Sequence, residues 1–255
     1  MTTLPRTPSF RLDGRRALVT GAGRGIGLAA AAAIAEAGAH VTLCARSAHE
    51  VEAAAAAITA RGEKAAHLVL DVTDTAAVRR VIAESGPFDI LINNAGGARH
   101  GPALDVTEEN FDFATDLNLK AAFFVAQEVA RGLVAAGRPG SLIHISSQMG
   151  HVGGPNRSVY CATKWAVEGF SKALAIELAP KGIRSNTIAP TFIMTEMVRG
   201  FFEDAKFKEW VLSKIKLGRI GRIEDLMGPV VFLASDASAL ITGTSLLVDG
   251  GWTAE

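Results

Sequence analysis

ALVTGAGRGIG, residues 17–27, passes from a short apolar run through a glycine-rich turn into a helical pattern that begins near Ile26. Glycine permits a tight turn and a close approach of the backbone to a ligand, and a helix start offers free N–H groups to phosphate. This order is typical of a nucleotide-binding βα unit, although a methyltransferase could carry the same loop. We expect five loop residues to border the ligand: Gly21, Arg24, Gly25, Ile26 and Gly27.

Six further apolar runs of strand length follow this unit, at residues 40–44, 66–70, 89–93, 141–146, 184–189 and 245–249. Helical patterns lie between most of them, and this alternation predicts a parallel sheet with helices on both faces. No low-complexity linker interrupts the chain. The sequence therefore predicts a single α/β domain over residues 1–255, with a doubly wound sheet of about seven strands.

Three stretches depart from this alternation. Residues 102–137 have the pattern of two consecutive helices with no strand between them. Residues 192–217 form an aromatic-rich insertion, which we interpret as a substrate lid, although an amphipathic helix packed on the body explains it equally well. Residues 1–11 are expected to form a flexible N-terminal arm.

Composition limits the partners of the chain. Its 255 residues carry 26 Lys and Arg against 26 Asp and Glu, so no net field attracts nucleic acid or an anionic membrane. Cys44 and Cys161 have neither disulfide-framework nor metal-ligand spacing. Prolines and arginines in residues 1–16 replace the apolar stretch of a signal peptide, and no segment resembles a membrane span. We expect a cytoplasmic protein with a small-molecule partner and no bound metal.

The residues at the ends of the second and third apolar runs indicate which nicotinamide cofactor the chain binds. No acidic residue follows the second run to bind a ribose 2′-hydroxyl; Arg46 stands there instead. Arg46 and Arg24 suit a 2′-phosphate, so we predict NADP(H) in preference to NAD(H), which remains possible. Asp71 and Val72 follow the third run, where the Asp71 carboxylate could accept a hydrogen bond from adenine or support a helix start at Thr73.

NNAG, residues 93–96, closes the fourth run, where the carboxyl ends of parallel strands border a ligand crevice. We expect Asn94, Ala95 and Gly96 to border the cofactor. For Asn93 a structural role is favoured, in which its side chain ties neighbouring backbones together.

Tyr160 is the only tyrosine, and Lys164 follows four residues later on the same face of a helix that ends before Pro180. A phenol needs a shift of about 4 kcal/mol to bring its pKa from about 10 to about 7. One ammonium about 4 Å away supplies that much at an effective dielectric constant near 20. We therefore predict that Lys164 lowers the pKa of Tyr160. Ser147 and Ser146 end the fifth run and are equal candidates to hold a substrate oxygen.

TGAGRGIG, NNAG, the asparagine of DLNLKAAF, Ser147 and YCATK together resemble the classical short-chain dehydrogenase/reductase family over residues 12–251. The resemblance implies a Rossmann-type fold and hydride transfer between the cofactor and a carbonyl or secondary alcohol. It selects Ser147 over Ser146 as the catalytic serine. It also implies that Asn118 holds a water molecule relaying protons to Lys164, and that Lys164 binds the nicotinamide ribose.

The same resemblance extends to the remaining cofactor and substrate contacts. It implies that Asp71 meets the adenine and that Pro190, Ile193 and Thr195 in APTFIMT lie near the nicotinamide carboxamide. It places the cofactor beside Tyr160 and Lys164. The expected substrate contacts are Ser147, Gln148 and Tyr160.

Several functions within this fold stay open. A 3-oxoacyl-carrier-protein reductase is favoured by Arg131, which could serve an acidic carrier protein, but is opposed by Ile176, where such enzymes often have arginine. A sugar or polyol dehydrogenase and a small-ketone reductase are alternatives, as is a non-catalytic NADP sensor. The resemblance also implies a homotetramer built on two long helices, about 106–136 and 159–178, and the C-terminal strand. Four alanines suit close helix contact or packing on the sheet: Ala121, Ala122, Ala126 and Ala130.

Overall fold

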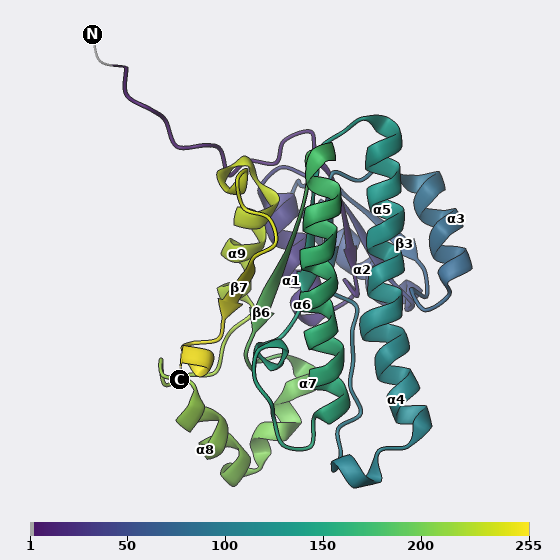
Figure 1. Ribbon diagram of the computed structural model, residues 1–255. Helices are drawn as coiled ribbons and strands as arrows, with labels where there is room; N and C mark the ends of the chain where they lie inside the picture. The colour runs from purple at the N-terminus through teal and green to yellow at the C-terminus, as the bar shows by residue number, and fades with distance from the viewer. Residues whose placement is uncertain (1–2, 255) are drawn as a thin grey trace.

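The computed structural model describes residues 3–254, apart from the side chain of Met197 (Figure 1). The ends of the expected domain, residues 1–2 and 255, lie outside the described residues. Within the described part, seven parallel strands form one sheet in the order β3-β2-β1-β4-β5-β6-β7. The strands are β1 (Arg16–Thr20), β2 (His40–Ala45), β3 (Ala65–Val69), β4 (Ile90–Asn93), β5 (Gly140–Ile145), β6 (Ile183–Pro190) and β7 (Ser245–Val248). The predicted single-domain α/β fold is confirmed.

Helices connect the strands. They are α1 (Gly25–Glu36), α2 (Ala48–Ala60), α3 (Thr75–Ser85), α4 (Glu108–Thr115), α5 (Ala122–Ala136), α6 (Ser158–Leu178), α7 (Glu196–Arg199), α8 (Ala205–Lys214) and α9 (Glu224–Ala234). Short 3₁₀ turns lie at Ala103–Asp105, Gln148–Gly150, Ala179–Lys181, Gly200–Glu203, Asp236–Ser238 and Trp252–Ala254. No helix in residues 3–254 is long and apolar enough to cross a bilayer.

Alternation along the strands separates two apolar cores. Val19 and Ile92 belong to a core with α1, α2 and α9, whereas their neighbours Leu18 and Leu91 belong to a core with α3, α5 and α6. Successive side chains of a strand point to opposite faces, so strands buried on both faces are apolar throughout. Figure 1 shows α5 and α6 side by side in front of the sheet.

Two local details refine the predictions from sequence. The two helices expected in residues 102–137 are present, and a π-helical segment, Asp116–Ala121, joins them without a break. The predicted helix start at Thr73 is wrong, because the side chain of Asp74 accepts hydrogen bonds from the N–H groups of Ala76 and Ala77. Thr73 donates instead to Asp71.

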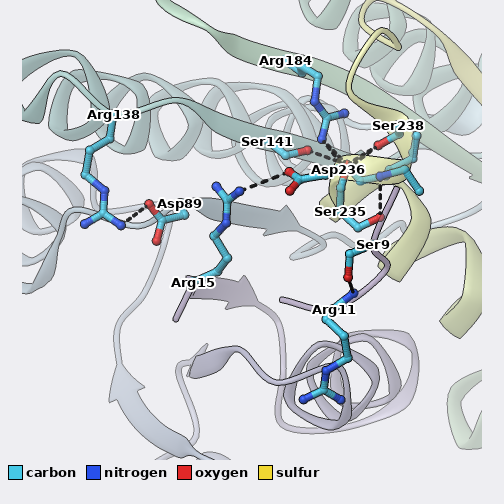
Figure 2. A network of polar contacts seen from close by, with 12 residues as sticks. Ser9, Arg11, Arg15, Asp89, Arg138, Ser141, Arg184, Ser235, Asp236 and Ser238 are labelled. Carbon is cyan, nitrogen blue, oxygen red and sulfur yellow. Dashed lines mark hydrogen bonds and ion pairs between the residues drawn. The ribbon is translucent and has the colours of Figure 1, made fainter. Parts of the chain in front are cut away.

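The amino ends of the strands are held by a network of polar contacts (Figure 2). Arg138 pairs with the buried Asp89 at 2.6 Å, and Arg15 pairs with Asp236 at 3.1 Å. Arg184 donates to the carbonyl of Leu233, which also accepts from Ser141. These contacts stabilise the amino ends of the strands, which lie opposite the expected ligand crevice.

The N-terminal arm leads away from the body as an exposed segment without helix or strand (Figure 1). Its last residues contact the domain, since the Phe10 ring lies 6.3 Å from that of Phe232 and Arg11 donates to the carbonyl of Glu36. Leu12 is fully buried. The flexibility of residues 1–11 stays a prediction.

Candidate active site

The glycine-rich loop opens onto a cleft at the carboxyl ends of the strands. Gly21 and Gly25 have φ values of 62° and 57°, a left-handed conformation that favours glycine. A Cβ atom at Gly27 would collide with the carbonyl oxygen of Gly21, so only glycine lets α1 pack this close to the loop. Arg24 precedes α1 without a side-chain cap, which leaves the first N–H groups of the helix free to receive a phosphate.

The cleft has a volume of about 680 Å³ and extends from this loop past the ends of β2, β3, β4, β5 and β6 to α6. Its position fits the reversal of strand order between β1 and β4, where doubly wound sheets bind ligands. All the residues that the sequence assigns to cofactor and substrate line it: Gly21, Arg24, Gly25, Ile26, Gly27, Arg46, Asp71, Val72, Asn94, Ala95, Gly96, Ser147, Gln148, Tyr160, Lys164, Pro190, Ile193 and Thr195.

Charged pairs surround the end of the cleft near β2 and β3. Arg46 lies 3.9 Å from Asp71, and Arg24 lies 3.5 Å from Glu50. Although partial burial acts to raise the pKa of Asp71, hydrogen bonds from Thr73 and the charge of Arg46 hold it below its usual value. Both guanidiniums are exposed, so they are free to move toward an anionic ligand.

The two asparagines after β4 brace the sheet. Asn93 donates to the carbonyl of Ala122 at 2.6 Å, which agrees with the structural role expected from sequence. Asn94 donates to the carbonyls of Thr20 and Gly21 and thereby ties the end of β4 to the glycine-rich loop. The backbone of Asn94 therefore borders the cleft in a fixed position.

The candidate catalytic side chains come from the turn after β5 and from α6. The Ser147 hydroxyl donates to Oε1 of Gln148 at 2.8 Å and accepts from the N–H of Met149. Lys164 donates to the carbonyl of Ile145 at 2.8 Å, and its Nζ lies 5.7 Å from the centroid of the Tyr160 ring. Ser146 also lines the cleft, but its buried hydroxyl has no partner among the described residues.

The pKa of Tyr160 departs from the prediction. Burial raises it above its usual value, while hydrogen bonding with Ser147 and the charge of Arg157 act in the opposite direction. The prediction that Lys164 lowers the pKa of Tyr160 is wrong for this structure, because the Lys164 ammonium donates to the Ile145 carbonyl instead of facing the phenol. Burial lowers the pKa of Lys164 to about 8, and the Glu168 carboxylate opposes that shift.

Glu168 lies one turn beyond Lys164 on α6 and is buried. Its carboxylate accepts from Thr187 at 2.8 Å and from Ser245 at 3.2 Å, and lies 3.4 Å from Nε2 of His151. Because Thr187 and Ser245 belong to β6 and β7, this carboxylate holds α6 against the sheet. The position of Lys164 depends on that contact.

Asn118 does not line the cleft. Its buried side chain accepts from the N–H of Gly97, donates to the carbonyl of Gly97 and donates to Thr163. The Asn118 amide thus joins the Gly97 backbone to α6, which is a structural role. It lies within the π-helical segment, a feature that is frequent at functional sites, and its water-holding role stays a prediction.

The aromatic insertion packs mainly on itself. Phe192 and Trp210 contact the Trp252 ring, and Phe202 and Phe207 contact Phe192. These rings pack in a small core with Met149, Val211 and Ile215. Backbone hydrogen bonds join Phe192 and Met194 to Gly221. Only its first part, as far as Phe201, lines the cleft. Packing on the body therefore explains most of the aromatic residues.

The structure brings other side chains to the cleft that motif spacing did not reveal. His100 meets the Tyr160 ring edge-on at 5.6 Å, and burial together with Arg157 lowers the pKa of this imidazole to about 4. Glu50 follows the N-cap Ser47 by three residues, a capping-box spacing that could have placed the start of α2 beside the cleft. No local pattern indicates His100. Within the described residues no group of histidine, cysteine or acidic side chains is arranged to hold a metal.

Comparison with known proteins bears on this geometry. A model of the enoyl-(acyl carrier protein) reductase family matches residues 21–253. D-erythrulose reductase of Gallus gallus is 40% identical over 245 residues, covering 96% of this chain and 98% of the relative. The chain belongs to the short-chain dehydrogenase/reductase family. It is thus an oxidoreductase of a family whose named relatives act on alcohol and carbonyl groups.

Two further relatives narrow the comparison. Gluconate 5-dehydrogenase of Gluconobacter oxydans (strain 621H) is 41% identical over 248 residues, covering 96% of each chain. The crystal structure of a gluconate 5-dehydrogenase from Burkholderia cenocepacia J2315, in complex with NADP and tartrate, has a TM-score of 0.93 and 40% identity. That alignment covers 96% of this chain and 98% of the other. The names of these three relatives are those of carbohydrate oxidoreductases.

Proposed function

We propose that this protein interconverts a carbonyl and a secondary alcohol of a sugar or polyol, using NADP(H). The observation that carries the proposal is that Ser147, Tyr160 and Lys164 form one wall of the same cleft that the glycine-rich loop enters. The carbohydrate oxidoreductases at about 40% identity, and the NADP in one solved relative, support the substrate class and the cofactor.

The residues at the cleft fit a dinucleotide. A Cβ at Gly27 would collide with the carbonyl oxygen of Gly21, so glycine is needed there for the loop to lie against α1. The free N–H groups at the start of α1 suit a pyrophosphate. Arg46 and Arg24 would hold a 2′-phosphate, and Asp71 would face the adenine. Residues Pro190, Ile193 and Thr195 would border the nicotinamide. NADPH, when bound, supplies the hydride for reduction.

The side chains of α6 and β5 handle the proton. A raised pKa keeps the Tyr160 phenol protonated, so it can donate its proton to the carbonyl oxygen during reduction and take it back during oxidation. Ser147 would hold the same oxygen after its hydroxyl turns from Gln148. The Lys164 ammonium lies 5.7 Å from the centroid of the Tyr160 ring and would stabilise the phenolate that remains once it turns from the Ile145 carbonyl. Asn118 completes the proposed route to water.

Replacement of Tyr160 tests this function. Tyr160→Phe removes only the hydroxyl, so we expect turnover to fall by about 10³-fold or more, since it abolishes proton transfer. NADPH binding, followed by cofactor fluorescence, should stay within about twofold because the ring remains. Turnover close to that of the parent protein would refute the proton role of Tyr160. NADPH binding by the parent without turnover of any sugar, polyol, ketone or quinone would favour the NADP-sensor alternative.

The carrier-protein alternative has less support in the geometry. Arg131, which could have received an acidic carrier protein, is paired with Glu128 on its own helix at 3.0 Å. Ile176, in place of a second arginine, is exposed. A sugar or polyol substrate therefore stays the favoured proposal, and an assay with an oxoacyl-carrier-protein substrate measures the alternative directly.

The proposal includes a homotetramer in the cytoplasm. Ala121, Ala122, Ala126 and Ala130 are buried against the sheet, so they do not supply an interface. Trp165 and Ile176, eleven residues apart on α6, are both exposed and lie on the same side of the helix. We propose that this side of α6 takes part in association between chains. Size-exclusion chromatography with light scattering determines the number of chains.

Residues 192–217 act as a lid in this proposal. Of this segment only residues 192–201 line the cleft, so closure would involve the part after Phe192, whose ring belongs to the aromatic core, while that core stays packed. Hydrogen exchange of residues 192–201, measured with and without NADPH and substrate, follows that closure.

A further inference from the structure

Arg157 stands at the substrate end of the cleft, in the last position before α6. Its guanidinium carbon lies 5.6 Å from the centroid of the Phe192 ring and 5.7 Å from that of Phe207. Its Nη1 donates to the carbonyl of Pro155 at 3.0 Å. Two rings and one carbonyl therefore fix the guanidinium in a half-buried place beside Tyr160.

No carboxylate in the described part of the chain pairs with Arg157. Its contacts are those two rings, the Pro155 carbonyl and the electrostatic effects of Tyr160, Cys161 and His100. Burial lowers the pKa of Arg157, yet a guanidinium stays charged at neutral pH. Burying an unpaired charge, even in part, costs free energy, and an anionic ligand that pairs with the charge offsets this cost.

Arg99 provides the contrast. It lies on the neighbouring loop, outside the cleft, and donates to Glu109 at 2.6 Å and to Asn110 at 3.1 Å. Its guanidinium also lies 4.5 Å from the centroid of the Phe113 ring. The chain thus neutralises one arginine near the site and leaves the other facing the cleft without an acid.

The groups near Arg157 also favour an anion. Gln148 lines the cleft, and because its Oε1 accepts from Ser147, its amide N–H₂ group is free of partners among the described residues. The cationic Lys164 lies on the same wall. His100 also contacts the Tyr160 ring, and burial keeps its imidazole neutral. Apart from the exposed Glu196, which also lines the cleft, the groups named around Arg157 are therefore donors or positively charged.

We propose that Arg157 binds a carboxylate of the substrate, so that this protein acts on keto-sugar acids and the corresponding hydroxy acids in preference to neutral ketoses. The inference rests on the proposed function and specifies its substrate class. A guanidinium binds a carboxylate through two parallel N–H···O bonds, which fixes the orientation of the ligand as well as its charge. The carboxylate thereby sets which carbonyl of the sugar meets Tyr160.

Two matched pairs of substrates test the inference. 5-Keto-D-gluconate and L-sorbose differ only in a carboxylate against a CH₂OH group, and so do 2-keto-D-gluconate and D-fructose. We expect the parent protein to prefer at least one acid over its neutral partner in kcat/KM with NADPH. Arg157→Gln should reduce that preference by about 10- to 100-fold, the range expected for charged hydrogen bonds.

Two variants separate binding from other effects. Arg157→Lys keeps the charge without the paired donors, so it should restore part of the preference. Arg99→Gln, the matched control, should leave the preference unchanged. Arg157 also acts on the pKa of Tyr160, so activity on the neutral partner serves as the internal reference for each variant.

A binding measurement is independent of turnover. With NADPH bound, D-gluconate and D-sorbitol cannot be oxidised, and D-gluconate should raise the melting temperature more than D-sorbitol does. Arg157→Gln should remove the difference. Equal preference for acid and neutral partners, or equal losses on both in Arg157→Gln, would overturn the carboxylate site while leaving the proposed function intact. Absence of NADPH oxidation with every sugar, polyol and ketone would contradict the proposed function itself.

Discussion

At the scale of single residues, Glu50 pairs with Arg24, which we propose binds the 2′-phosphate of the cofactor. Its carboxylate lies 3.5 Å from Arg24, and both side chains are partly exposed. An exposed pair of this kind is worth about 0–1 kcal/mol, which is enough to reduce the contact of Arg24 with a 2′-phosphate. We therefore expect Glu50→Gln to lower KM for NADPH by about 2- to 5-fold while KM for NADH is unchanged.

Glu52→Gln is the control for this prediction. Glu52 lies on the same helix and is exposed, and its carboxylate is 3.9 Å from His67. Steady-state kinetics with both cofactors should show no change for this variant. An equal fall in KM for NADPH and NADH in Glu50→Gln would mean that Arg24 does not bind the 2′-phosphate of NADPH.

The sequence could predict which residues line the cleft but not their electrostatic state. Motif spacing placed Ser147, Tyr160 and Lys164 correctly because the ends of parallel strands and the following helix converge on one edge. The pKa of Tyr160 was predicted wrongly, since burial and the position of the Lys164 ammonium depend on the folded surroundings. Arg157 is a candidate polar contact from sequence alone, but its lack of an acidic partner among the described residues depends on the folded surroundings, which no spacing rule contains.

At the scale of elements, the approach of α1 to the end of β1 depends on Gly27. We expect Gly27→Ala to weaken NADPH binding by at least about 10-fold and to lower the free energy of unfolding by about 1–3 kcal/mol, because the new methyl group collides with the Gly21 carbonyl. Fluorescence titration and urea unfolding measure the two effects.

Gly169 provides the matched substitution in another helix. A Cβ there meets nothing within 4 Å, and the residue lies inside α6 without a positive φ. Gly169→Ala should therefore raise the free energy of unfolding by about 0.5–1 kcal/mol, since alanine is the better helix former. A loss of stability equal to that of Gly27→Ala would contradict this distinction between crowded and open positions.

Strands were easier to predict than helix boundaries. All seven apolar runs became strands within one or two residues, because a strand buried on both faces needs an unbroken apolar run. The start of α3 was misplaced by one residue, since Asp71, Thr73 and Asp74 can all cap a helix and tertiary contacts decide among them. The π-helical segment before α5 has no distinct pattern in the sequence.

At the scale of the whole molecule, His144 couples stability to pH. It lies buried in β5 between Asn93 and Ser185, and burial lowers its pKa to about 3. A histidine in the unfolded chain has a pKa of about 6.5. Below that pH the unfolded chain therefore binds a proton at His144, whereas the folded chain does not. Stability is therefore lost as the pH falls from about 6.5 toward 3, by up to about 1.4 kcal/mol per pH unit.

Urea unfolding at pH 7, 6 and 5 measures this dependence. His144→Gln should flatten the fall in midpoint between pH 6 and pH 5, whereas His40→Gln, at an exposed position, serves as the control for loss of a histidine. An unchanged slope in His144→Gln would show that His144 takes up its proton in the folded protein.

The separate aromatic core around Trp252 has an evolutionary consequence. It shares none of its fully buried residues with the two cores that hold the sheet and the nucleotide-binding loop. Apart from Ile193, which belongs to the core with α1, α2 and α9, and Thr195, which lines the cofactor cleft, positions in residues 192–217 can accordingly change after gene duplication without loss of the fold or of cofactor binding. New substrates within this lineage would then arise by divergence of one short segment, and exchanging that segment between paralogues is a practical route to altered specificity.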